Sequence, residues 1–176
     1  MDFFEAVEKR ASYRLAFAEQ EIPEEDIRRI VTAGLQAPSG YNFQTTSFVI
    51  VRDADTRKKL ADLIPTPATK TAPVILVAVS ERKINEAKGA ANFAFDTQDY
   101  AAAVENIMLG IVAMGYAGVW MDGMSRMNDA DAQIAELLRV PEGKWVRSII
   151  PFGVPTKVVA QKEKKSFEER VVWDHF

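Results

Sequence analysis

The chain has 176 residues, 48% of them hydrophobic, and a formal net charge of −3. This length favours one domain with a sizeable core, and this charge argues against nucleic acid or an anionic membrane as a partner. Cysteine is absent and His175 is the only histidine, which excludes disulfides, thiolate metal sites and histidine-based triads within one chain. The N-terminus does not resemble a signal peptide, and no apolar run approaches membrane-spanning length. We therefore expect a cytoplasmic protein without membrane contact.

Two helices are predicted in the first forty residues. Asp2 is a candidate cap for a helix that ends near Arg10, and Phe3, Phe4 and Val7 share one of its faces. Pro23 opens a second helix, whose first turn is acidic, and Pro38 stops it. The apolar spacing of this second helix predicts a buried stripe of Ile27, Ile30, Val31, Gly34 and Leu35.

Strands and helices alternate through the middle of the chain. We predict a strand over 47–52, a helix with an aspartate cap over 53–64, and a strand over 72–80 whose unbroken apolar run suits a central position covered on both faces. Residues 80–95 are mixed and carry no clear pattern. The longest helix is predicted over 96–114 and is apolar on most faces, with Gly115 as its C-cap.

The last third predicts a strand over 117–121, a turn, a capped helix over 128–138 and a strand over 145–153. Helices on both sides of a small sheet give an α+β domain with three layers, α/β/α. After Pro155 a basic tail follows, and it also carries Phe167, Val171, Val172, Trp173 and Phe176. Such a tail packs either on a second subunit or on its own subunit.

Several familiar catalytic patterns are missing. There is no G-x-G-x-x-G after a strand, no Walker lysine motif, no G-x-S-x-G, and no recognisable catalytic carboxylate pair. Since few side chains suit acid–base or nucleophilic work, the difficult chemistry would have to come from a cofactor.

The remaining polar groups each have a plain reading beside a functional one. In "RASYR", Arg10, Ser12 and Arg14 fall on one side if the segment is extended, and two guanidinium groups with a hydroxyl suit a phosphate and its polyol. The plain reading is a solvated helix end. The plain readings of "APSGYNFQ", of Asp122-Gly123 and of the tail lysines are turns and a solvated segment.

Taken in order, these segments resemble the nitroreductase family of flavoproteins. The resemblance rests on "RASYR", on "APSGYNFQ" before a strand, and on a long alanine-rich helix that ends in "MGYAGVWM". It continues through "LRVPEG", "IIPFGVP" and a basic tail before "FEERVVW", so it spans essentially the whole chain. The chain is similar to short members of the family.

The resemblance implies a central, mostly antiparallel sheet flanked by helices, in an intertwined homodimer with two FMN sites. It implies an FMN-binding domain over 1–155 and a C-terminal extension over 156–176 that packs on the partner subunit. By position, Arg10 and Ser12 would hold the phosphate and ribityl end, and Arg14 would lie near the pyrimidine edge. Pro38, Ser39 and Asn42 of the partner subunit would line the flavin. The Asp122-Gly123 turn would approach the reactive side of the ring. The implied cofactor-binding residues are Arg10, Ser12, Arg14, Pro38, Ser39, Gly40, Asn42, Gln44, Asp122, Gly123, Lys162 and Lys164.

The implied activity is hydride transfer from NADH or NADPH through flavin N5 to a small-molecule acceptor such as a nitroaromatic or quinone, in a ping-pong scheme without a catalytic side chain. Reductive dehalogenation, flavin breakdown, a non-catalytic FMN-binding protein and a dimeric module without cofactor remain alternatives. The chain departs from the family pattern at Ala11, where a second arginine is usual, and at Thr45 and Thr46, where proline and an aromatic are common. An asparagine and a lysine expected near "PTPATK" have no safe match.

Overall fold

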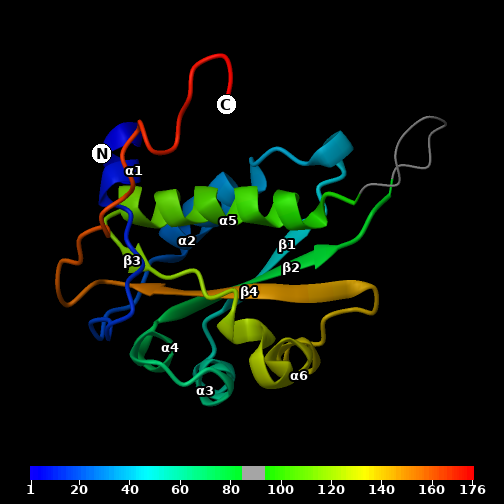
Figure 1. The fold of residues 1–176 in the computed structure, drawn as a ribbon. Coiled ribbons are helices and arrows are strands. Elements are labelled where there is room, and N and C mark those ends of the chain that lie inside the picture. The colour runs from blue at the N-terminus through cyan, green and yellow to red at the C-terminus, as the bar shows by residue number, and fades with distance from the viewer. Residues whose placement is uncertain (85–93) are drawn as a thin grey trace.

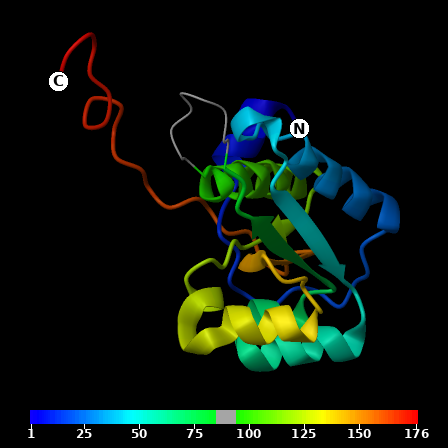
Figure 2. The same cartoon turned by 90° about the vertical axis from the view of Figure 1, so that its right-hand side faces the viewer.

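A computed structural model of the chain describes residues 1–84 and 94–176. Most of the segment without a clear sequence pattern lies outside these ranges. Within them, no helix combines the length and apolar character needed to cross a membrane. The elements alternate much as the hydrophobic pattern predicts, and they form three layers (Figures 1 and 2).

The described strands form one sheet in the order β1-β2-β4-β3, and every neighbouring pair is antiparallel. Its members are β1 (Thr46–Val51), β2 (Val74–Glu81), β4 (Lys144–Gly153) and the short β3 (Ala117–Gly118). The predicted antiparallel sheet is therefore confirmed. The strand expected over 117–121 is wrong in length, because beyond Gly118 only Met121 forms a further bridge, to Ile149.

Strand β2 is the centre of the core, as its apolar run predicts. Its side chains alternate between two hydrophobic clusters, as the period of two in a strand requires. Val74, Leu76 and Ala78 face the cluster built with α2 and α5, and Ile75, Val77 and Val79 face the other cluster. Both faces of the sheet are therefore buried under helices.

Helices α1, α2 and α5 lie over one face of the sheet, and α3, α4 and α6 lie over the other (Figure 1). Short 3-10 turns, η1 and η2, precede β1 and α6. The bounds of the helical elements are α1 (Phe3–Lys9), α2 (Glu24–Leu35), η1 (Gly40–Asn42), α3 (Ala54–Leu63), α4 (Pro67–Thr71), α5 (Asp96–Ala113), η2 (Met124–Asp129) and α6 (Ala130–Leu137).

Helix starts follow the capping rules that the sequence suggests in most places. Asp2 accepts the backbone N–H of Glu5 at 2.9 Å, and Asp53 caps α3 through Thr56. Helix α5 ends as predicted, with Gly115 just beyond it at φ +85°, a conformation that glycine adopts without strain.

Some local predictions are wrong. Leu35, expected in the buried stripe of α2, is 56% exposed at the last residue of the helix, although Gly34 before it is buried. Helix α6 begins at Ala130, where η2 runs directly into it, and its N-cap Asp129 forms no side-chain capping bond. The segment "PTPATK" contains helix α4, which the sequence analysis missed because its capping residues, Thr66 and Thr69, form a box of two threonines.

A bulge in β4 turns Arg147 away from the strand ladder. Val79 pairs with Val146 and Ala78 pairs with Ser148, so Arg147 has no opposite residue. Bulges of this kind redirect a side chain. Here the guanidinium group forms an ion pair with Asp96 and donates to the Ser80 hydroxyl at 2.5 Å. This contact ties the first turn of α5 to the sheet.

The other end of α5 is tied to α2 by a hydrogen bond. The hydroxyl of Tyr116, which follows the helix, donates to Asp26 in the first turn of α2 at 2.5 Å. Burial, and then the bond to Asp26, raise the pKa of Tyr116 to about 12. The neutral phenol is therefore the form that the folded state favours.

Replacing Arg147 with alanine should destabilise the protein markedly. The Asp96 side chain is only 10% exposed and would lose its cation, and removing one partner of a buried pair costs about 3 kcal/mol. The control is Arg28→Ala, which breaks an exposed pair with Glu24 and should cost under about 0.5 kcal/mol. Urea unfolding of both variants measures the difference, and equal losses would contradict the role of the bulge.

The Tyr116–Asp26 bond should make stability fall at alkaline pH. The unfolded tyrosine loses its proton near its ordinary pKa of 10, whereas the folded one holds it to about 12. Between these values the unfolded state binds fewer protons, so the free energy of unfolding decreases as pH rises. Because Tyr116 is partly exposed, we expect a slope below about 1 kcal/mol per pH unit. Chemical unfolding from pH 9 to 11.5 should show a shallower decline for Tyr116→Phe; identical slopes would contradict the assignment.

Candidate functional site

The segment after α1 is extended and docks beside β3. Ser12 forms a parallel bridge with Gly118, and the N–H of Tyr13 donates to the Gly118 carbonyl at 2.9 Å. Tyr13 is buried, and its hydroxyl contacts Ala16 and Thr156. Since side chains alternate along an extended segment, Ser12 and Arg14 lie on the side opposite Tyr13, as the sequence pattern predicts.

Positive charge gathers along this segment. The Arg10 Nε lies 3.5 Å from Glu105 on α5, and the exposed Arg14 donates to the Ser12 carbonyl at 3.5 Å. Within residues 1–84 and 94–176, neither Arg14 nor the tail lysines Lys162 and Lys164 form an ion pair. Cations without carboxylate partners on an exposed segment can accept an anionic ligand such as a phosphate.

The C-terminal tail returns to the same place. The Gln161 side chain donates to the carbonyls of Val7 at 3.1 Å and Arg10 at 2.8 Å. Lys162 therefore follows directly after a residue that is bound to the end of α1. Beyond this anchor the tail runs away from the folded body (Figure 2), and Lys164 lies on its exposed part.

The Asp122-Gly123 turn continues the path of β3. Tyr100 of α5 donates its hydroxyl to Asp122, and Arg126 forms an ion pair with the same carboxylate. Burial, and then the contact with Asp122, raise the pKa of Tyr100. The carboxylate is therefore engaged in holding its own turn, while the space beside Gly123 is open, because a Cβ built there meets nothing within 4 Å.

Trp120 lies in the chain between β3 and the Asp122-Gly123 turn. Its indole Nε1 is buried and has no hydrogen-bond partner in the described part of the chain, which is unusual for a buried polar atom. The segment that carries Ser12 and Arg14 is bridged to Gly118, two residues before Trp120 in the chain.

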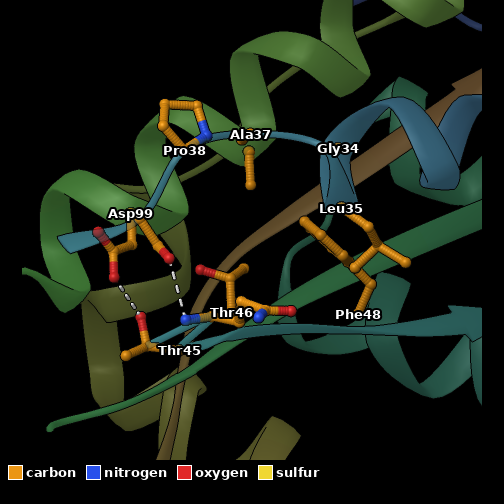
Figure 3. A pocket seen from close by; sticks show the side chains of 11 residues that line it. Gly34, Leu35, Ala37, Pro38, Thr45, Thr46, Phe48 and Asp99 are labelled. Atoms are coloured by element: carbon orange, nitrogen blue, oxygen red, sulfur yellow. Dashed lines mark hydrogen bonds between the residues drawn. The ribbon is translucent and has the colours of Figure 1, made fainter. Parts of the chain in front are cut away.

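The loop after α2 carries further expected site residues and is held at the first turn of α5. Ser39 accepts the Gln44 N–H at 3.0 Å, and the buried carboxylate of Asp99 accepts the N–H of Gly40 and the hydroxyl of Thr45, both at 2.8 Å. A cavity of about 180 Å³ lies beside this loop (Figure 3), lined by residues that include Pro38, Thr46 and Phe48. It is smaller than the roughly 300–1,000 Å³ of typical ligand pockets.

The structure places the expected site residues on three segments. Arg10, Ser12 and Arg14 lie on the extended segment, with Lys162 following Gln161, which is bound to Arg10. Pro38, Ser39, Gly40, Asn42 and Gln44 lie on the loop after α2, and Asp122 and Gly123 form a turn that Tyr100 and Arg126 hold. Each segment contacts α5, through Glu105, Asp99 and Tyr100 respectively.

The residues that hold these segments in place, Asp99, Tyr100 and Arg126, belong to none of the motifs recognised in the sequence. One signal was available: Asp96 and Asp99 are two short acids at the start of an otherwise apolar helix, where a carboxylate must find a partner if it is buried.

Comparisons with known proteins show the family of the chain. The model of the family described as "Nitroreductase family" matches residues 7–65 and 62–154. The chain belongs to the nitroreductase family. It is 30% identical over 158 residues to a Methanothermobacter thermautotrophicus protein named "Putative NADH dehydrogenase/NAD(P)H nitroreductase", a match that covers 89% of this chain and 79% of that protein.

Solved structures of other nitroreductase-like proteins share the fold. A Desulfovibrio desulfuricans structure, described as a nitroreductase in complex with FMN, is 25% identical and superposes with a TM-score of 0.82 over 100% of this chain and 98% of its own. The NADPH:FMN oxidoreductase of Vibrio harveyi, complexed with NAD+, is 24% identical with a TM-score of 0.81 over 99% of this chain and 77% of its own.

Proposed function

We propose that this nitroreductase is an FMN-dependent oxidoreductase that uses NADH or NADPH. The observation that carries the proposal is the basic segment 10–14, docked against Gly118 of β3 in a chain of this family. The names of its relatives, which include an NAD(P)H nitroreductase and a nitroreductase complexed with FMN, support the same activity.

The residues present fit FMN. Arg10, Arg14 and Lys162 offer cations for its phosphate or for a reduced ring, and Ser12 offers a hydroxyl. The orphaned indole N–H of Trp120 needs an acceptor, and the carbonyls and ring nitrogens of an isoalloxazine are acceptors. The open face of Gly123 lets backbone approach a planar ring without a side chain between them.

Each residue has a separate proposed role. Arg10, Ser12, Lys162 and Lys164 hold the phosphate and ribityl end. Arg14 lies toward the pyrimidine edge, where a cation favours the charge that reduction adds. When bound, FMN supplies the redox chemistry, taking hydride from NAD(P)H at N5 and returning it to a nitroaromatic, quinone or similar acceptor in a ping-pong scheme.

No side chain of this site is proposed as a general acid. The Asp122 carboxylate is bound by Tyr100 and Arg126, and burial and Asp122 keep Tyr100 neutral by raising its pKa. Protons for the acceptor therefore come from solvent. This assignment agrees with a chain whose single histidine lies next to the C-terminus.

A second copy of the chain would complete the site. The basic segment and the loop after α2 contact α5 at different residues, Glu105 and Asp99. The cavity beside the loop is too small for a whole flavin. Large apolar side chains are exposed on α1 and in the tail: Phe3, Phe4, Val7, Phe167, Val172 and Trp173. We propose an intertwined homodimer in which the 156–176 extension packs on the partner and the partner's loop, with Pro38, Ser39, Gly40, Asn42 and Gln44, faces the flavin.

The purified protein should show a flavin absorption spectrum that bleaches without oxygen when NADH or NADPH is added. Arg10→Ala and Lys164→Ala should each raise the Kd for FMN by about 10-fold or more, because a hydrogen bond to a charged group contributes about 1.5–3 kcal/mol. Titration of the apoprotein with FMN, followed by flavin fluorescence, measures this change.

The control for these variants is Lys9→Ala. Lys9 adjoins Arg10 but pairs with Glu5 on the exposed face of α1, so its loss should leave FMN affinity unchanged. A colourless protein that takes up no added FMN would contradict the proposal. Tight FMN binding without oxidation of either nicotinamide would favour a non-catalytic flavoprotein, and selective turnover of one halogenated or flavin substrate would favour the related alternatives.

The dimer makes a prediction of its own. Light scattering should give twice the chain mass of 19.6 kDa, and Phe4→Glu, which places a charge on the exposed face of α1, should shift the protein toward monomer with weaker FMN binding. Lys59→Glu, on α3 across the sheet, should remain dimeric. A wild-type protein that is monomeric with FMN bound would contradict the shared site.

A further inference from the structure

The loop from Ser39 to Thr45 has a backbone that its own sequence does not favour. Tyr41, Asn42 and Gln44 all have φ between +51° and +55°. Asparagine tolerates this left-handed region, but Tyr41 and Gln44 pay a steric cost there. A loop with three such residues keeps this conformation only if surrounding contacts determine it.

The bonds within the loop cannot do this alone. The Gln44 N–H to Ser39 Oγ contact, and those from Asn42 and Phe43 back to Ser39 and Gly40, join residues of the same loop. They close the turn but do not attach it to the body of the protein. Attachment depends on contacts that leave the loop.

Asp99 supplies two of these external contacts. One carboxylate oxygen accepts the Gly40 N–H and the other accepts the Thr45 hydroxyl, both at 2.8 Å. The contacts grip the loop at both ends, and Asp99 itself is 5% exposed in the first turn of α5. Figure 3 shows the Asp99 carboxylate facing Thr45 beneath the loop.

Two further contacts agree with a fixed loop position. The Glu81 N–H donates to the Thr45 carbonyl at 3.1 Å, which ties the same end to the sheet. A Cβ built on Gly40 would lie 2.4 Å from the Phe95 ring, so the loop packs closely against the start of α5. The Asp99 carboxylate reaches both ends of the loop.

We propose that Asp99 is a positioning residue, which holds the loop 39–45 ready to receive the flavin of the partner's site before the cofactor binds. This inference rests on the proposed function, since the loop meets FMN only if the chain is a dimeric flavoenzyme. Asp99 acts through Gly40 and Thr45, and it does not itself contact the ligand.

Substitutions at Asp99 and Thr45 can remove or keep the two hydrogen bonds. Asp99→Ala removes both acceptors and leaves the Gly40 N–H and the Thr45 hydroxyl without partners. Asp99→Asn can keep both bonds, because its carbonyl accepts from Gly40 while its amide donates to the Thr45 oxygen. Thr45→Val removes one bond, and Thr45→Ser keeps it.

The matched control is Asp96→Ala. Asp96 lies in the same turn of α5, is buried to a similar degree, and binds Arg147 instead of the loop. Its loss should destabilise the fold at least as much as the loss of Asp99. A general weakening of α5 would therefore appear in both variants, whereas release of the loop would appear only in Asp99→Ala.

The experiment measures amide hydrogen exchange of the cofactor-free protein and its Kd for FMN. In Asp99→Ala, peptides spanning 39–45 should exchange at least 10-fold faster and the Kd for FMN should rise about 10-fold. Asp99→Asn should recover most of both, and Thr45→Val should fall between. Asp96→Ala should lower the melting temperature while leaving loop exchange and the Kd within about twofold of wild type.

Two results would overturn the inference: wild-type loop exchange in Asp99→Ala, or equal effects in Asp99→Ala and Asp96→Ala. A wild-type protein that binds no FMN would instead overturn the proposed function and the flavin role of the loop. Exchange in the cofactor-free protein would still decide whether Asp99 holds the loop, so the two failures are distinguishable.

Discussion

The burial of strand β2 on both faces is the constraint on which the rest of the structure depends. A strand whose side chains are apolar on both sides can avoid water only if helices cover each face of its sheet. Helices α2 and α5 do so on one face, and α3, α4 and α6 on the other. Polar residues with a function are consequently displaced to the ends and edges of these layers.

Polar side chains at the start of α5 hold several of these residues in place. Within five residues, Asp96 binds the bulged Arg147, Asp99 binds the loop after α2, and Tyr100 binds Asp122. Acids in a first turn also complement the helix dipole. One rigid helix end thus sets the positions of the sheet bulge, the strained loop and the acidic-Gly turn relative to one another.

The cations of the proposed flavin site are arranged on a different principle. They lie on an extended segment held by backbone contacts to Gly118 and by the Gln161 side chain of the tail, and apart from Arg10 they lack carboxylate partners among the described residues. An unpaired charge on the surface is hydrated and costs little free energy, and it can bind an anion. We proposed that these cations bind FMN, and in the proposed dimer the partner's loop would complete the site.

The sequence alone determined the order and type of most elements, because hydrophobic periodicity and capping are local properties that a chain carries wherever it packs. It also indicated the alternating Arg10, Ser12 and Arg14, since an extended segment with a buried Tyr13 leaves them on one side. The sequence did not predict helix α4, which begins with a threonine capping box. It did not predict the exposure of Leu35 either, which depends on where α2 ends. Only the tertiary structure decided which groups meet: Asp99 with Gly40 and Thr45, Tyr100 with Asp122, and the bulged Arg147 with Asp96. These contacts join residues far apart in the chain, and their partners are selected by packing geometry, which no local pattern encodes.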